Sequence, residues 1–209
     1  MTLVLNLKTY PGTYGTELEN LLDNLPYLDD LVVCPQHTDL NRVADTQYTT
    51  YAQHISPKEP GRNTGANTAE AVAETGAEGT LINHSERRLR DREVKKAVKR
   101  AEHAGLETVV CAQKPAEVAR YSALGTDAVA LEIPELIAGE ESISDTEPQV
   151  LRESVRRSDV PVLAGAGIST MEDVEKALQL GADGVLVASA VAKADNPAEK
   201  LSELHAPLH

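Results

Sequence analysis

The chain of 209 residues has no tryptophan and no phenylalanine, and its six tyrosines bring the aromatic content to only 3%. A core without large aromatic rings is filled by valine, leucine, isoleucine and alanine, which suits a parallel sheet covered by helices. The composition argues against a β-sandwich or an aromatic-cage binding module. The hydrophobic residues, 41% of the total, are spread evenly and no charged or Gly/Ser-rich linker divides them. We therefore expect residues 1–209 to form a single domain.

Basic residues are also scarce: the chain has 20 lysines and arginines and 33 acidic residues, which gives a net charge of −13. No basic stripe is present to neutralise a phosphate backbone, so we expect no nucleic-acid partner. No apolar run approaches the about 18 residues of a membrane span, and we expect no membrane partner. The N-terminus enters Leu3-Val4-Leu5-Asn6 directly, without the pattern of a signal peptide, which predicts a cytoplasmic protein.

Cysteine is limited to Cys34 and Cys111, both within or at the end of apolar runs. This placement predicts buried free thiols rather than a disulfide framework. The chain has no C-x-x-C pair and no histidine cluster at metal-ligand spacing, so the sequence does not indicate a metal site.

Eight short apolar runs are typical of buried strands, and helical patterns separate them. The runs are Leu3–Leu7, Leu31–Cys34, Tyr48–Gln53, Gly79–Ile82, Thr108–Cys111, Ala128–Leu131, Val160–Ala164 and Gly184–Val187. Eight such units favour an α/β fold of the closed (β/α)8 barrel type, with an open doubly wound sheet as the alternative, because periodicity does not show closure. A typical barrel uses about 250 residues, so we expect a trimmed one with short helices after its second and third strands.

Polar side chains follow three of these strands, where a barrel would bring them to one face. Lys8 follows the first strand and can hold an anionic substrate, although a solvated lysine also fits this position. His84 lies where the fourth strand passes toward the helical pattern of Asp91 to Ala104, a place that favours a neutral imidazole. Glu132 follows the sixth strand, where it can serve as a general base or form a structural ion pair.

Small residues follow the last two strands, in Gly165-Ala166-Gly167-Ile168-Ser169 and in Ala188-Ser189-Ala190. They allow backbone N–H groups to approach an anion closely, and barrels often bind phosphate at this place. The segment from Ile133 to Gly139 has a stiff start, an apolar middle and a flexible end. This composition fits a hinged lid, and also an ordinary loop before a helix.

Together these residues resemble the triosephosphate isomerase family, particularly its shorter archaeal form. The resemblance spans nearly the whole chain and is most specific in the His-Ser-Glu-Arg-Arg tract. The motifs are Asn6-Leu7-Lys8, Ala52-Gln53-His54, Gly65-Ala66-Asn67-Thr68-Ala69-Glu70, Asn83-His84-Ser85-Glu86-Arg87-Arg88, Glu132-Ile133-Pro134-Glu135-Leu136-Ile137, Gly165-Ala166-Gly167-Ile168-Ser169 and Ala188-Ser189.

The resemblance implies a TIM barrel that interconverts dihydroxyacetone phosphate and D-glyceraldehyde 3-phosphate through an enediolate, without a metal or other cofactor. It assigns the proton transfer to Glu132 and the polarisation of the carbonyl to a neutral His84, a pairing already described for this family. The remaining roles are charge stabilisation by Lys8, substrate orientation by Asn6 and support of the network by Glu86. Substrate binding falls to Asn6, Leu7, Lys8, Ile137, Gly167, Ala188 and Ser189.

The resemblance also implies a homodimer or homotetramer, because the Pro57 to Glu70 loop matches a region that often packs into a neighbouring subunit. The chain departs from the family at Ile133, where proline is usual, and in Ala138-Gly139-Glu140-Glu141, so lid closure is expected to differ. Ala190 also stands where glycine is common, and its methyl group narrows the phosphate site slightly.

Two alternatives remain at this point. Another phosphate-binding barrel enzyme, a lyase or transferase, would share the glycine motifs, but it does not readily explain His84 together with Glu132. A noncatalytic phosphate-ligand binding protein would need the cradle and Lys8 but no base.

Overall fold

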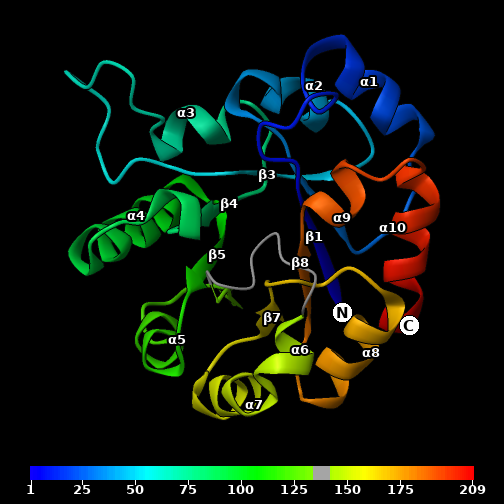
Figure 1. Cartoon of the computed structure of the whole chain (residues 1–209). Helices are drawn as coiled ribbons and strands as arrows, with labels where there is room; N and C mark the ends of the chain where they lie inside the picture. The colour runs from blue at the N-terminus through cyan, green and yellow to red at the C-terminus, as the bar shows by residue number, and fades with distance from the viewer. Residues whose placement is uncertain (134–141) are drawn as a thin grey trace.

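In the computed structural model, which describes residues 1–133 and 142–209, eight parallel strands form a closed barrel (Figure 1). Each strand pairs with the next along the chain, and β8 returns to pair with β1. The strands are β1 (Thr2–Asn6), β2 (Leu31–Cys34), β3 (Thr49–Ala52), β4 (Gly79–Ile82), β5 (Glu107–Ala112), β6 (Ala128–Leu131), β7 (Val162–Ala164) and β8 (Gly184–Val187). The closed order confirms the predicted (β/α)8 barrel and excludes the open sheet.

The helices surround these strands (Figure 1). They are α1 (Gly15–Asn24), α2 (Leu40–Ala44), α3 (Ala69–Ala73), α4 (Asp91–Ala104), α5 (Pro115–Ser122), α6 (Ile143–Thr146), α7 (Pro148–Arg157), α8 (Met171–Gln179), α9 (Ser189–Ala192) and α10 (Pro197–His205), with the 3-10 turns η1 (His37–Asp39), η2 (Ser85–Arg87) and η4 (Ala206–Leu208). The helices after the second and third strands, α2 and α3, have five residues each, as the chain length predicts.

Two hydrophobic layers follow from the alternation of side chains along each strand. On β1, Val4 belongs to the cluster inside the barrel, whereas Leu3 and Leu5 belong to the layer between strands and helices. The inner cluster contains Val4, Val32, Cys34, Tyr51, Leu81, Val109, Cys111, Ala130, Leu163 and Leu186. Both cysteines are buried and free, as predicted.

The helix after the His84 tract shows how the sequence sets local structure. The predicted apolar stripe of α4 is buried, and the carboxylate of Glu93 accepts a hydrogen bond from the backbone N–H of Arg90 at its start (3.1 Å). Gly105 ends the helix in the left-handed conformation (φ 73°), which glycine adopts without a steric cost. The helix α4 therefore has a defined start and a defined end.

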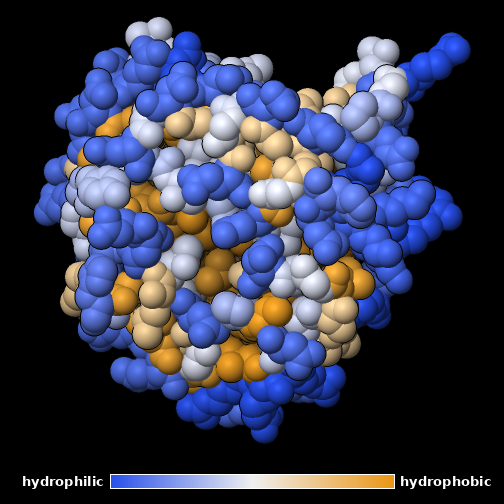
Figure 2. Space-filling view, turned by 180° about the vertical axis from the view of Figure 1, so that it is seen from behind, coloured by the Kyte–Doolittle hydropathy of each residue, from blue (hydrophilic) through white to orange (hydrophobic). Residues whose placement is uncertain are grey.

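On the face shown in Figure 2, hydrophilic residues predominate, and hydrophobic ones are visible in a central hollow. The segment between β3 and α3 projects away from the barrel as an arm (Figure 1), and Lys58 to Arg62 within it are exposed. Among the described residues, no helix is both long enough and apolar enough to cross a lipid bilayer.

Candidate active site

A cavity of about 170 Å³ opens at the carboxyl ends of the strands, where barrels of this kind place their active sites. Residues after β1, β4, β6, β7 and β8 all contribute to it. Its lining consists of Lys8, His84, Glu132, Gly165, Gly167, Ile168, Ser169, Leu186, Val187, Ala188, Ser189 and Ala190. The structure therefore brings together the three chemical groups and the two small-residue segments that the sequence singles out.

Lys8 is held at the cavity by its backbone and by its ammonium group. It adopts a left-handed conformation (φ 48°) that is costly for a residue with a Cβ atom. Its N–H donates to Asn6 Oδ1 (3.1 Å), and its carbonyl accepts from Gln53 Nε2 (2.9 Å). The Nζ atom lies 2.7 Å from Glu86 Oε1. These contacts hold a strained backbone in place and direct a nearly buried cation into the site.

His84 and Glu132 form a direct pair, with Nε2 of the histidine 3.0 Å from Oε1 of the glutamate. The other ring nitrogen, Nδ1, accepts a hydrogen bond from the backbone N–H of Glu86 (3.2 Å). A nitrogen that accepts a hydrogen bond carries no proton, so the ring is neutral and its proton lies on Nε2. These contacts are those of an uncharged donor that faces the carboxylate.

Glu132 is almost completely buried, with 1% of its surface exposed. Its second oxygen, Oε2, accepts from the N–H of Ser85 (3.2 Å), and its backbone N–H donates to the carbonyl of Ala112 (2.8 Å). The 3-10 turn η2 thus directs one N–H at Glu132 and the next at His84. Both oxygens of this buried carboxylate therefore contact groups of the connection after β4, one at His84 and the other at Ser85.

The turn that carries His84 depends on Asn83, the residue before it in the same motif, for which no role was predicted. Asn83 has a positive φ (67°) and 1% exposure. Its Nδ2 donates to the carbonyl of Cys111 on β5 (2.9 Å), and its Oδ1 accepts from the N–H of Leu89 (2.8 Å). This bridge connects β5 to the end of the turn. The sequence signal was a polar residue directly after an apolar run, next to the candidate histidine.

Cys111 is a second residue without a predicted role in the site. Burial raises the pKa of its thiol well above the ordinary value, and the charge and hydrogen bonding of Glu132 add to that effect. The thiol is therefore a neutral neighbour of the carboxylate. Its position in an apolar run predicts its burial, but not its contact with Glu132.

The small residues after β7 and β8 form one wall of the cavity. Gly167 has a positive φ (69°), and Ser189 begins the short helix α9. The N–H groups of Gly167, Ser189 and Ala190 donate to no acceptor within residues 1–133 and 142–209. Three backbone donors beside one cavity, with Lys8 on its lining, suit a phosphate group.

Other predicted substrate contacts lie elsewhere. Leu7 is fully buried in the layer between strands and helices, and Asn6 accepts from the N–H of Lys8; neither is part of the cavity lining. Glu86 also lies outside the lining and contacts it through Lys8 and His84. Ile137 and the rest of the proposed lid after Ile133, with its departures at 138–141, fall outside the described residues.

Comparisons with known proteins place the chain in a family. The family model described as triosephosphate isomerase matches residues 1–204. The triosephosphate isomerase of Halobacterium salinarum is 47% identical, with 100% of both chains covered. That of Caldivirga maquilingensis is 41% identical over 99% of this chain and 96% of its own. That of Methanocaldococcus jannaschii is 40% identical over 98% of both chains. The crystal structure of triosephosphate isomerase from Bartonella henselae has a TM-score of 0.74 at 19% identity, covers 96% of this chain and 97% of its own, and shows the same fold.

Proposed function

The chain belongs to the triosephosphate isomerase family, and from this membership we propose how its own residues interconvert dihydroxyacetone phosphate and D-glyceraldehyde 3-phosphate. The enzyme is an aldose–ketose isomerase of the reactions that make and consume triose phosphates. Because the chain belongs to this family over its length, we set aside both alternatives, a lyase or transferase and a noncatalytic binding protein. What remains to be assigned is the role of each residue.

The pairing of His84 with Glu132 carries the mechanism, because a neutral donor and a buried carboxylate lie 3.0 Å apart in one cavity. Glu132 releases its contacts with His84 and Ser85 and takes a proton from the carbon beside the substrate carbonyl. The electron pair left by that C–H bond forms the enediolate. Glu132 then returns the proton to the neighbouring carbon, which completes the isomerisation without net gain or loss of electrons.

His84 stabilises the charge that develops on the substrate oxygen. Its Nε2–H donates to the carbonyl, and the same nitrogen moves protons between the two enediolate oxygens. Lys8 supplies a positive charge beside the developing oxyanion. Because the cavity walls exclude much of the solvent, these fixed donors act more strongly than they would in water.

We assign phosphate binding to the N–H groups at Gly167, at Ser189 and around Ala188, with Ile137 as a further contact that lies outside the described residues. Asn6 supports Lys8, and Glu86 holds its ammonium group. No step requires a metal or an organic cofactor.

A coupled assay with D-glyceraldehyde 3-phosphate tests these roles. Glu132→Asp moves the carboxylate back by one methylene, and we expect kcat to fall by about 10²-fold because small misplacements of a reacting group are costly. His84→Gln removes the imidazole, with an expected loss of about 10²–10⁴-fold. Glu102→Asp and His103→Gln make the same changes at exposed positions of α4 and serve as controls. Full kcat/KM in either active-site variant would refute the assigned roles.

We further propose a homodimer or homotetramer in which the Pro57 to Glu70 loop contacts a neighbouring subunit. The projecting arm and its exposed residues support this proposal (Figure 1). At its base, Glu70 pairs with Arg100 of α4, which fixes the direction of the arm. Sedimentation equilibrium should give two or four chains per particle, and a monomer at micromolar concentration would contradict the proposal.

We also propose that residues 1–209 form one domain and that the enzyme is cytoplasmic. Its free cysteines suit that compartment.

A further inference from the structure

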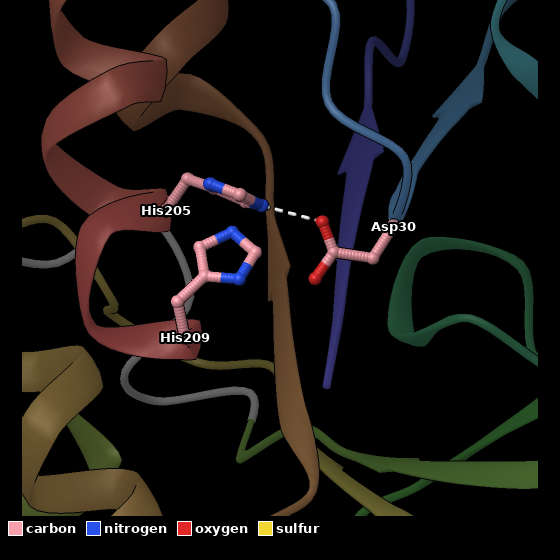
Figure 3. A group of neighbouring side chains, drawn as sticks. All are labelled: Asp30, His205 and His209. Atoms are coloured by element: carbon pink, nitrogen blue, oxygen red, sulfur yellow. Dashed lines mark hydrogen bonds and ion pairs between the residues drawn. The ribbon is translucent and has the colours of Figure 1, made fainter.

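A second group of chemically reactive side chains lies at the opposite end of the barrel from the active site (Figure 3). Asp30 directly precedes β2, at the amino end of that strand. His205 is the last residue of α10, and His209 follows the 3-10 turn η4. One candidate ligand atom from each of the three side chains lies within 4.8 Å of the other two.

The fold holds the two elements that carry this group. His205 and His209 are four residues apart on a nearly continuous helical segment, the spacing that places side chains on one side of a helix. Their rings make an edge-to-face contact with centroids 4.5 Å apart. Leu208, buried in the outer hydrophobic layer, anchors the turn just before His209. On the barrel side, the carbonyl of Asp30 accepts from the N–H of Leu3 (3.2 Å), so the carboxylate extends from a fixed turn.

The three side chains differ in exposure in a way that suits a bound cation. His205 is buried and its Nε2 forms a hydrogen bond with Asp30 Oδ1, while Asp30 is half-buried and His209 is exposed. Within residues 1–133 and 142–209, no lysine or arginine pairs with the Asp30 carboxylate. The net charge of −13 also favours cations over the whole surface.

Two imidazole nitrogens and one carboxylate oxygen are a donor set that binds Zn²⁺. Donor atoms about 2.0–2.1 Å from a tetrahedral zinc ion lie about 3.3 Å from one another. Asp30 and His205, which are now in direct hydrogen-bond contact, must therefore separate slightly to bind the ion. His209 must move toward them, and its exposed ring can make this movement.

We propose that Asp30, His205 and His209 bind one Zn²⁺ ion, with water in the fourth position. The ion takes the place of the proton between Asp30 and His205, which is released to the solvent, and it ties α10 and η4 to the amino end of the barrel. Its role is structural, because the cavity with Lys8, His84 and Glu132 lies at the other end of the strands. The sequence alone does not indicate this site, since Asp30 is 175 residues away from His205.

Calorimetric titration of EDTA-treated protein with ZnCl₂ tests the proposal. Wild type should bind one Zn²⁺ per chain, with a rise in Tm, and His209→Gln should weaken binding by at least about tenfold, the loss that follows even from removal of an outer-shell partner. His209 is exposed, so this variant is expected to fold. His103→Gln removes an exposed histidine from α4 and should bind as wild type does. Absence of stoichiometric binding, or equal binding by wild type and His209→Gln, would overturn the proposal.

Two further measurements separate this site from weak binding of cations to an acidic surface. MgCl₂ at the same concentration should leave Tm unchanged, because Mg²⁺ prefers oxygen ligands in octahedral geometry. Co²⁺ should give the visible absorption of a tetrahedral site in wild type and lose it in His209→Gln. An equal rise in Tm with Mg²⁺ and Zn²⁺, or a Co²⁺ spectrum that His209→Gln does not change, would count against the three-residue site.

Discussion

Two residues with unusual backbone conformations lie at or next to the proposed active site. Lys8 and Asn83 are the non-glycine residues with positive φ in residues 1–133 and 142–209, and each directly follows or lies near the end of an active-site strand. Such a conformation costs roughly 1–2 kcal/mol for an ordinary residue and persists only where the surrounding contacts enforce it. For Lys8 these contacts come from Asn6 and Gln53. For Asn83 they are the hydrogen bonds of its side-chain amide with Cys111 and Leu89.

Replacement of Asn83 separates its backbone role from its side-chain role. Asn83→Gly tolerates the positive φ but removes both hydrogen bonds, which leaves the carbonyl of Cys111 and the N–H of Leu89 without partners. We expect a loss of about 1–3 kcal/mol in the free energy of unfolding and a fall in kcat of about tenfold, because the turn that orients His84 loosens. Asn83→Ala adds the conformational cost of about 1 kcal/mol. Urea unfolding and steady-state kinetics measure both effects; wild-type kcat in Asn83→Gly would show that the bridge does not position His84.

Gly165 provides the space that Glu132 occupies. A Cβ atom at this position would lie 3.0 Å from Glu132 Cγ and 3.3 Å from the carbonyl oxygen of Leu131, closer than ordinary packing allows. Gly165→Ala should therefore displace the carboxylate and lower kcat by about 10²-fold, with a smaller effect on KM. Ala190→Gly removes a methyl group from another part of the lining of the same cavity, and should retain wild-type kcat. The prediction fails if both variants have the same kcat.

At the scale of elements, the connections after β2, β3 and β4 lie close together at His37 and His54. His37 of η1 donates from Nε2 to the carbonyl of His54, which follows β3 (2.5 Å). Burial lowers the pKa of His54 to about 4, and the nearby positive charge of Arg87 from η2 and the charge of His37 lower it further. Burial also lowers the pKa of His37. The packing of these connections therefore requires neutral imidazoles.

This requirement makes stability depend on pH. In the unfolded chain His54 takes up a proton near its ordinary pKa of about 6.5, whereas the folded chain resists protonation until about pH 4. The unfolded state thus binds more protons in this window, and the free energy of unfolding falls as the pH drops from about 6.5 to about 4. His54→Gln removes this contribution and should reduce the loss between pH 7 and pH 5 by about 1 kcal/mol, after allowance for partial solvent access. Urea unfolding of both proteins at the two pH values measures it; equal losses would contradict the prediction.

At the scale of the whole molecule, the barrel depends on the pairing of its first and last strands. Thr2 pairs with Gly184 and Leu3 with Val185 along this join, and Gly184 also pairs with Leu163 of β7. A Cβ atom on Gly184 would overlap the carbonyl oxygen of Thr2. Gly79 of β4 has a similar role, because a Cβ atom there would lie 2.6 Å from the ring of Tyr51, which belongs to the cluster inside the barrel. Glycine is required at both places by close contact and not by positive φ.

The sequence predicts most of this architecture because strand periodicity is a local property. Gly79–Ile82 begins and ends as expected, since the apolar run stops at Asn83. The first strand is displaced by one residue, to Thr2–Asn6, because the chain turns at Lys8 and the side chain of Leu7 packs into the outer layer. Contacts that join distant segments follow no spacing in the sequence. The bridge from Asn83 to β5 and the pairing of Asp30 with His205 are contacts of this kind. The packing of Leu7 in the outer layer, which keeps it out of the cavity lining, also depends on distant segments.

Gly184→Ala tests whether the join between β1 and β8 limits the stability of the barrel. The added methyl group meets backbone atoms of Thr2, which cannot rotate away as a side chain can, so the two strands must separate. We expect a loss of about 1–3 kcal/mol or more in the free energy of unfolding, measured by urea titration and by Tm. Gly105→Ala is the matched control, because its Cβ meets nothing within 4 Å and only its φ of 73° carries a cost, about 1 kcal/mol. If Gly184→Ala is no less stable than Gly105→Ala, close backbone contact at this join is not what requires glycine.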